Sequence, residues 1–227
     1  PVEIRDEEIF IGLEAEPEAP RTVTDVMAET MVNWGVKSVF GMVGHSNLGL
    51  ADALRRQTLK GNLQYIGIRH EGVASFAASA YGKLTGRPAA CLTIAGPGAT
   101  NLMTGLWDAK VDRAPVLALT GQVQTQVFGP GAFQDIDLKS AFHAVSRFSQ
   151  PVLSTSNHAE LMTLACKTAL TESDVSHLIF PDDVQTVPSE AKASGPDGRV
   201  TSPVILPDPD GLKQALDLIN AARRPVF

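Results

Sequence analysis

The segment RHEGVASFAASAYGKLTG, residues 69–86, contains the first candidate for chemistry. It sets Arg69, His70 and Glu71 directly before a run of Gly, Ala and Ser. A carboxylate at the head of a helix can simply face the positive end of the helix dipole. It can also hold a proton and share it with a ligand. The residue types alone leave both roles open for Glu71.

Three further segments combine glycine with polar or titratable residues, and each follows a predicted strand. They read GMVGHSN (41–47), AGPGATN (95–101) and TGQVQTQVFGPGAFQD (120–135). Turns from strands into helices need glycine in any case, so one such segment is weak evidence. Because open parallel sheets bind ligands beyond the carboxyl ends of their strands, four segments at one edge favour a binding site.

The glycine turn at 95–101 does not match a nucleotide-binding motif. It has neither the Lys and Ser/Thr of a P-loop nor the G-x-G-x-x-G spacing. This turn is more typical of a backbone that approaches a flat ligand. His143, His158 and His177 show no metal-ligand spacing, so no metal site is predicted in this chain.

Helix-like and strand-like patterns alternate from Thr22 onward. Continuously apolar strands such as 88–96 and 114–121 indicate strands covered on both faces. The pattern predicts an α/β fold with an open, mostly parallel sheet and helices on both faces. Predicted helices span 22–35, 48–56, 69–86, 97–112 and 158–170, and predicted strands span 36–41, 62–68, 88–96, 114–121 and 176–181.

The domain organisation follows from changes in composition. We expect an acidic N-terminal tail (1–21) without signal-peptide character, a large domain (22–188) and a linker rich in Pro, Gly and Ser (189–210). Residues 211–227 begin a further helix and the first residues of a strand, which cannot bury a core. The chain is therefore expected to be the N-terminal piece of a longer polypeptide.

Composition narrows the range of partners and compartments. The chain has 227 residues, 44% of them hydrophobic, and a formal net charge of -6. This charge and the lack of a basic stripe argue against nucleic acid or an anionic membrane as the main partner. Cys91 and Cys166 lie in apolar segments and are expected to be reduced core thiols rather than a disulfide. The predicted location is the cytoplasm.

The four segments, in this order and spacing, resemble the pyrimidine-binding domain of thiamine-diphosphate-dependent enzymes of the acetolactate synthase and pyruvate oxidase group. The similarity runs from about Thr22 to Pro188. In that family the glutamate matching Glu71 hydrogen-bonds the N1' nitrogen of the cofactor's aminopyrimidine ring, which favours removal of the proton from the thiazolium C2. The resemblance implies a catalytic role for Glu71.

Other positions are assigned by the same resemblance. Pro97, Gly98 and Asn101 match the turn that lies against the pyrimidine ring. Phe133 and Gln134 match a segment beside the substrate pocket, although Phe133 could equally be a core residue. Gln122, at a strand end, is either a pocket residue or a cap of its own turn.

Two positions depart from the family pattern. His45 stands where relatives usually have glycine or serine, and Val43 where they usually have proline. An imidazole there could relay protons or hold a substrate carboxylate, or it could pack against the following helix. Asp182 stands where acetolactate synthases generally carry lysine, which weakens the assignment to that enzyme in particular.

The resemblance implies a reaction, cofactors and partners. The expected enzyme decarboxylates a pyruvate-like 2-oxo acid and transfers or oxidises the resulting carbanion-enamine. The family holds the diphosphate through Mg²⁺ on a G-D-G segment, which is absent here, so Mg²⁺ is expected on a separate pyrophosphate domain; use of FAD stays open. The cofactor site is expected at the interface of a homodimer or tetramer. The alternative is a non-catalytic or subunit-type module that docks on a separate pyrophosphate-domain chain.

Overall fold

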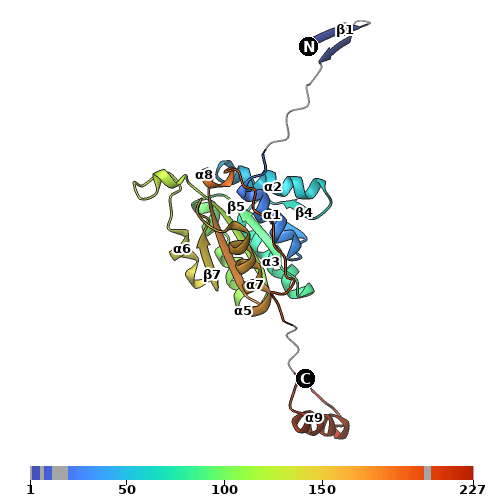
Figure 1. The fold of residues 1–227 in the computed structure, drawn as a ribbon. Coiled ribbons are helices and arrows are strands. Elements are labelled where there is room, and N and C mark those ends of the chain that lie inside the picture. Colours follow the sequence, from blue (N-terminus) through green and yellow to red (C-terminus); the bar gives the residue numbers. More distant parts are fainter. Residues whose placement is uncertain (1, 6–7, 12–19, 202–205, 227) are drawn as a thin grey trace. The chain divides into compact units, whose positions relative to one another are not determined.

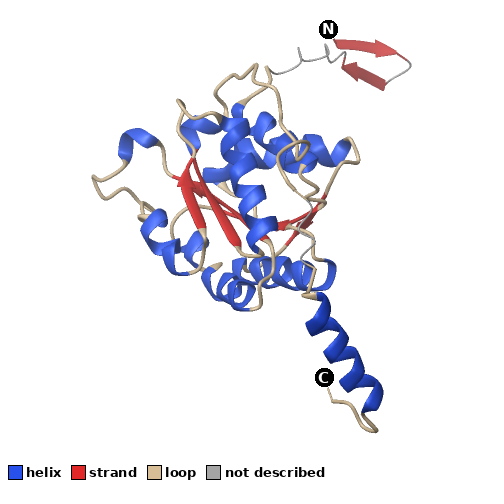
Figure 2. Ribbon diagram, turned by 60° about the horizontal axis from the view of Figure 1, so that its bottom comes forward, coloured by secondary structure: helices blue, strands red, loops and turns tan. Residues whose placement is uncertain are grey.

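A six-stranded parallel sheet forms the centre of the computed structural model, which describes residues 2–5, 8–11, 20–201 and 206–226. Its strands lie in the order β4-β3-β5-β6-β8-β7, and every neighbouring pair is parallel. Their bounds are Ser38–Gly41 (β3), Gln64–Gly67 (β4), Ala89–Thr93 (β5), Val116–Gln122 (β6), Phe148–Pro151 (β7) and Val175–Pro181 (β8). Figure 2 shows these strands between layers of helices.

The helices cover both faces of this sheet (Figure 1). The main ones are α1 (Val23–Asn33), α2 (Leu48–Leu59), α3 (Glu71–Thr85), α5 (Met103–Val111) and α7 (His158–Glu172). Short helices are α4 (Pro97–Thr100), α6 (Leu138–Ala141) and α8 (Asp182–Gln185), with 3-10 turns η1 (His45–Asn47), η2 (Thr125–Val127) and η3 (Phe142–Ala144). One core layer joins α1, α2 and α7 to the sheet, and the other joins α3, α5 and α6.

Alternate residues of each central strand enter the two core layers. In β5, Ala90 and Leu92 belong to the α1 side, whereas Ala89 and Cys91 belong to the α3 side. All five residues of β5 are buried, which explains why the strand is continuously apolar in the sequence. The predicted fold class is therefore confirmed.

Both cysteines are buried and unpaired, as the sequence predicts. Cys91 lies in one core layer and Cys166 in the other. Burial raises the pKa of the Cys91 thiol to about 12, because a thiolate cannot be solvated there. Neither thiol is placed to react.

One titratable side chain, His177, lies in the middle of β8 and is fully buried. Its Nε2 and Nδ1 atoms are each 2.9 Å from a hydroxyl oxygen, of Thr120 and Ser149 respectively. The Phe142 ring stacks on the imidazole with 3.9 Å between ring centroids. Burial lowers the pKa of His177 to about 3, so the imidazole is neutral in the folded protein.

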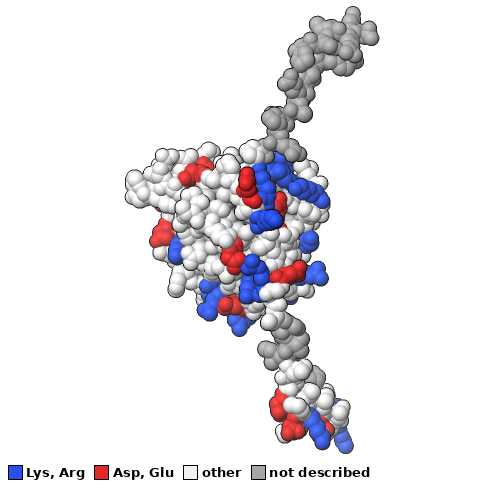
Figure 3. Space-filling model, in the orientation of Figure 1, with Lys and Arg blue, Asp and Glu red and all other residues white. Residues whose placement is uncertain are grey.

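Basic and acidic residues lie close together on the molecular surface. Lys and Arg are interspersed with Asp and Glu on the face that Figure 3 shows. No helix in the described ranges is both long and apolar enough to cross a bilayer.

Several elements differ from the sequence predictions. Within the expected N-terminal tail, β1 (Val2–Arg5) and β2 (Glu8–Ile11) pair as a two-stranded antiparallel sheet. The helix predicted over 97–112 is interrupted, because Leu102 N bonds to Ala99 O three residues back and so forms a tighter turn between α4 and α5. Strand β7 was not predicted.

The domain boundary predicted at residue 188 stays a prediction, but the first compact unit of the structure extends to Asp197. Residues 188–194, here called the strap, run along α1 and α7 and belong to the first compact unit, Pro1–Asp197. Ser189 N bonds to Arg21 O at 2.9 Å, and Ser194 N bonds to Thr30 Oγ1 at 3.2 Å. These hydrogen bonds fix the strap, so a Pro- and Ser-containing composition here does not mean a free linker.

The second unit, Gly198–Phe227, contains helix α9 (Pro209–Ala221). Asp208 caps the helix by accepting a 2.8 Å hydrogen bond from Gly211 N. Residues 222–226 form no strand in the structure, whereas the sequence predicted the first residues of one there. Leu212, Leu216 and Ile219 are exposed on α9.

Candidate functional site

The four glycine-containing segments lie at one edge of the sheet, at its topological switch point. From β3 the chain first moves to β4 on one side and then to β5 on the other. The carboxyl ends of β3 and β5 are therefore adjacent and lead into turns on opposite sides of a crevice, where α/β sheets bind ligands. Met42 N bonds to Leu92 O at 3.0 Å and ties these two ends together.

Glu71 is the first residue of α3 and lies on this edge, partly exposed. The preceding His70 caps the helix, since its Nδ1 accepts a 3.1 Å hydrogen bond from Gly72 N. Glu71 Oε2 accepts a 3.0 Å hydrogen bond from Asn101 Nδ2. Within the described residues, no donor is recorded on the other oxygen, Oε1, so that oxygen can receive a ligand.

The small residues of α3 serve contacts within the chain. Gly72, Ala74, Ser75, Ala78 and Ser79 are buried against the sheet and α5. The side of α3 that faces away from the sheet carries larger exposed residues instead, Val73, Phe76 and Leu84. The helix can thus pack closely on its own domain while it leaves an apolar face uncovered.

Gly98 keeps the space beside the Glu71 carboxylate open. A Cβ at this position would lie 2.6 Å from Ile94 Cγ1 and 3.3 Å from Glu71 Oε1. Any side chain at Gly98 would therefore block Oε1. Pro97, next in the turn, is exposed. Glu71, Gly98 and Asn101 form a cradle with one free carboxylate oxygen, which fits a flat ring with a hydrogen-bonding nitrogen.

His45 lies on the neighbouring turn, at the start of η1, and its residue is exposed. The turn is built by its neighbours: Gly44 N bonds to Asn47 Oδ1 at 2.9 Å, and Asn47 Nδ2 bonds to Met42 O at 3.0 Å. The alternative that His45 packs against the following helix is not supported, because the side chain is open to solvent.

The loop after β6 brings Phe133 and Gln134 to the same edge. A Cβ at Gly96 would lie 2.7 Å from Gln134 Cβ, so Gln134 lies against the turn before α4. Phe133 is 89% exposed, which excludes the core position that the sequence left open. The start of the loop is fixed by Asp183, whose Oδ1 accepts a 2.8 Å hydrogen bond from Thr125 N.

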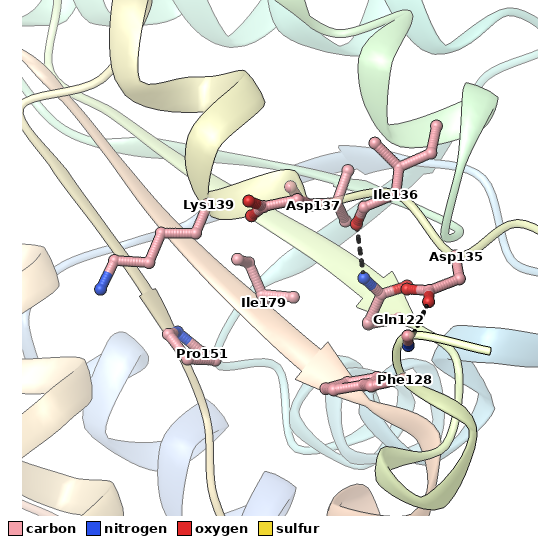
Figure 4. A pocket seen from close by; sticks show the side chains of 10 residues that line it. Gln122, Phe128, Asp135, Ile136, Asp137, Lys139, Pro151 and Ile179 are labelled. Atoms are coloured by element: carbon pink, nitrogen blue, oxygen red, sulfur yellow. Dashed lines mark hydrogen bonds between the residues drawn. The ribbon is translucent and has the colours of Figure 1, made fainter. Parts of the chain in front are cut away.

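Gln122 bonds both to the start of the loop after β6 and to Ile136 near its end. Its Nε2 donates a 2.8 Å hydrogen bond to Ile136 O, and its Oε1 accepts a 2.9 Å bond from Val123 N. Gln122 also lines a cavity of about 410 Å³ (Figure 4), whose walls include Phe128, Pro151 and Ile179. Because Glu71, Gly98 and His45 do not line this cavity, it is separate from the cradle.

The structure thus gathers most, but not all, of the predicted site residues. Glu71, Gly98 and Asn101 are in contact, and Gln134 lies one turn away. His45 lies at the same edge but forms no hydrogen bond with Glu71 among the described residues. The sequence did not reveal Ser46 and Gln185, both buried, which hold the turn of His45. The one sequence signal for Ser46 was that it is a short polar residue between Gly44 and Gly49. No group of three or more possible metal ligands occurs among the described residues.

Comparison with known families identifies the class of protein that this fold and cradle define. Residues 21–141 match the family model of thiamine pyrophosphate enzymes, N-terminal TPP binding domain. The chain belongs to this family, and the match covers the turns that carry His45, Glu71, Gly98 and Phe133. The predicted resemblance to the acetolactate synthase and pyruvate oxidase group is confirmed.

Individual relatives extend the match over nearly the whole chain. The putative thiamine pyrophosphate-containing protein YdaP of Bacillus subtilis is 37% identical over 214 residues, 92% of this chain and 36% of that protein. Acetolactate synthase of Arthrospira platensis is 34% identical over 222 residues, 95% of this chain and 38% of that protein. The chain spans about a third to a half of the length of the curated relatives it matches.

Proposed function

We propose that this chain is the cofactor-activating N-terminal domain of an enzyme that decarboxylates a 2-oxo acid such as pyruvate and then transfers or oxidises the remaining fragment. The observation that carries the proposal is the Glu71 carboxylate, with one oxygen bonded to Asn101 and the other open beside Gly98. Family membership and relatives named acetolactate synthase support the same reading.

In this proposal Glu71 holds and shares a proton at Oε1 with the aminopyrimidine ring. Asn101 orients the carboxylate through Oε2, and Gly98 leaves room for the ring against the backbone. The cofactor, when bound, supplies a nucleophilic carbon and an electron sink. The protein's own contribution is therefore activation and orientation.

His45 is proposed to act on the substrate side of the site. Its exposed imidazole can hold a substrate carboxylate when protonated and accept a proton when neutral. Phe133 and Gln134 are proposed to line the substrate pocket from the loop anchored at Asp183. Gln122 supports the loop and is not assigned to the pocket itself.

We further propose that the site is completed by a second subunit. Val73 and Phe76 on α3 and Trp107 on α5 are 53%, 46% and 53% exposed, although they are large and apolar. An uncovered face of this kind is typical of an interaction surface. In this arrangement Mg²⁺ and the diphosphate would be held by a pyrophosphate domain outside these 227 residues.

Release of CO2 by the full-length protein tests the proposed function. Pyruvate and larger 2-oxo acids would be supplied with and without thiamine diphosphate and Mg²⁺, and CO2 would be quantified. Calorimetry with thiamine diphosphate alone and with Mg²⁺ would measure binding separately. Absence of cofactor binding, or cofactor binding without CO2 release from any 2-oxo acid, would contradict the proposal.

A further inference from the structure

Gln185, the last residue of α8, is a polar side chain that is almost completely buried, with 1% exposed. Its Nε2 donates hydrogen bonds to Ser46 O at 2.8 Å and Phe180 O at 3.1 Å. Its Oε1 accepts a 3.0 Å hydrogen bond from Leu50 N. The amide thus connects the end of β8 to two places in a segment far away in the sequence.

The two distant partners of Gln185 flank the turn that carries His45. Ser46 directly follows His45, and Leu50 N is one of the first helical N–H groups of α2, which have no partner within the helix. No side chain at the start of α2 caps it. Gln185 therefore supplies the acceptor for Leu50 N and, through its bond to Ser46 O, holds the η1 turn in place.

Ser46 passes this constraint on to the turn that carries Gly98. Its Oγ accepts a 2.8 Å hydrogen bond from Ala95 N, and its residue is 6% exposed. A Cβ at Gly121 would lie only 2.3 Å from Ser46 O, so the end of β6 presses on the same turn. The turns after β3 and β5 and the end of β6 therefore meet at Ser46.

We infer that Gln185 is a positioning residue that fixes the His45 turn relative to the Gly98 turn. The amide of Gln185 donates from Nε2 and accepts at Oε1, so one buried side chain satisfies Ser46 O, Phe180 O and Leu50 N together. An apolar side chain of equal volume would fill the space but would leave Ser46 O and Leu50 N without this partner, which is unfavourable for buried groups. A displaced His45 turn is expected to lower the catalytic rate, because small displacements of reacting groups are costly. This consequence rests on the proposed function.

A comparison of two buried glutamines in the full-length protein tests this inference. Gln185→Met removes the amide, and Gln57→Met is the matched control. Gln57 is 2% exposed, and its Oε1 accepts a 2.8 Å hydrogen bond from Asn62 at the far end of α2. Both variants are expected to melt at lower temperature. If Gln185→Met does not fold, Ser46→Ala replaces it as the test variant, because it removes only the hydrogen bond between Ser46 Oγ and Ala95 N.

The first readout is amide hydrogen exchange, which does not depend on catalysis. Gln185→Met is expected to speed exchange at Leu50 N at least tenfold relative to Gln57→Met, and Ser46→Ala is expected to do the same at Ala95 N. Exchange at both amides no faster than in the Gln57→Met control would overturn the inference. This result would stand whether or not the protein proves to be a 2-oxo acid decarboxylase.

The second readout is the kinetics of the loaded enzyme. Gln185→Met is expected to lower kcat about 10 to 100-fold, whereas Gln57→Met leaves kcat unchanged. In a His45→Ser background, Gln185→Met should change kcat less than about threefold, since the two residues act as a unit. Independent, multiplying effects of the two substitutions would overturn the positioning role.

Discussion

Asn101 Nδ2 donates a 3.0 Å hydrogen bond to Glu71 Oε2, although the two residues are 30 positions apart in the chain. They come from the turns after β5 and β4, which lie on either side of β3 in the sheet. The bond assigns different tasks to the two carboxylate oxygens. Oε2 fixes the orientation of the side chain, and Oε1 faces the space that Gly98 keeps open.

The first prediction concerns the carboxylate itself. Glu71→Gln in the full-length protein is expected to slow exchange of the cofactor's C2 proton by about 10² to 10⁴-fold, because an amide cannot share a proton as a carboxyl group does. Exchange would be followed by NMR in deuterated buffer. Glu172→Gln, at an exposed ion pair with Arg147, is the control. Unchanged exchange in Glu71→Gln would remove Glu71 from the mechanism.

The second prediction separates orientation from charge at Asn101. Asn101→Ala removes the donor to Glu71, whereas Asn101→Asp replaces it with a second carboxylate at the same short distance. We expect C2 exchange to fall in both variants, and binding of thiamine diphosphate to weaken more in Asn101→Asp. Calorimetry and NMR exchange measure the two effects. Equal behaviour of both variants and the unaltered protein would mean that the contact is incidental.

The third prediction concerns His45. His45→Ser is expected to lower the rate about 10 to 1000-fold, as for the loss of one positioned acid-base group. Since the side chain is exposed, the melting temperature should change little. Steady-state rates and a thermal melt measure both. A stable, fully active variant argues against any role for this histidine.

The fourth prediction addresses the apolar face of α3 and α5. Phe76→Glu and Trp107→Glu are each expected to shift the protein toward smaller species in analytical ultracentrifugation. The protein concentration would be on the order of tens of micromolar, at which a small interface still associates. Leu59→Glu is the control, because Leu59 is also large, apolar and 74% exposed but lies on α2. Identical sedimentation of all variants would place the interface elsewhere.

The fifth prediction is a pH dependence of stability that originates at His177. The unfolded chain takes up a proton at this residue below pH about 6.5, whereas in the folded protein the pKa of His177 is lowered to about 3. The contribution of neutral His177 to the free energy of unfolding is therefore complete above pH about 6.5. It is lost as the pH falls, at up to about 1.4 kcal/mol per pH unit.

Urea unfolding at pH 4 to 7, with His177→Gln for comparison, checks this pH dependence. The substitution keeps groups that can bond to Thr120 and Ser149 but removes the titration. The unaltered protein should therefore lose more stability between pH 6.5 and 4 than the variant. If stability depends on pH in the same way in both proteins, burial of His177 does not cause the loss of stability at acid pH.

Much of the fold was predictable because its signals are local. The strands β5, β6 and β8 are buried at every position and largely apolar, and segments that contain glycine follow β5 and β6. Strand β7 was missed because its residues, FSQP, are only partly buried and polar enough to read as a loop. The strap was missed because hydrogen bonds to α1, and not its own composition, fix its conformation.

The candidate site was predictable to a similar extent. Glu71, Gly98 and Asn101 stand out through motifs, and the structure brings them together. The burial of Gln185 was not predictable, because a single glutamine after a strand has no periodicity that reveals its environment. Likewise, only the structure distinguishes Phe133, which is exposed, from a core phenylalanine such as Phe142.

The position of β8 has a consequence for the order in which the domain can form during synthesis. Along the described part of the chain β8 is the last strand, but it lies between β6 and β7 and pairs with both. Until Pro181 has left the ribosome, β6 has an open edge and β7 has no strand beside it. During this stage of synthesis the nascent chain therefore carries unpaired backbone groups on both strands, a condition that favours aggregation.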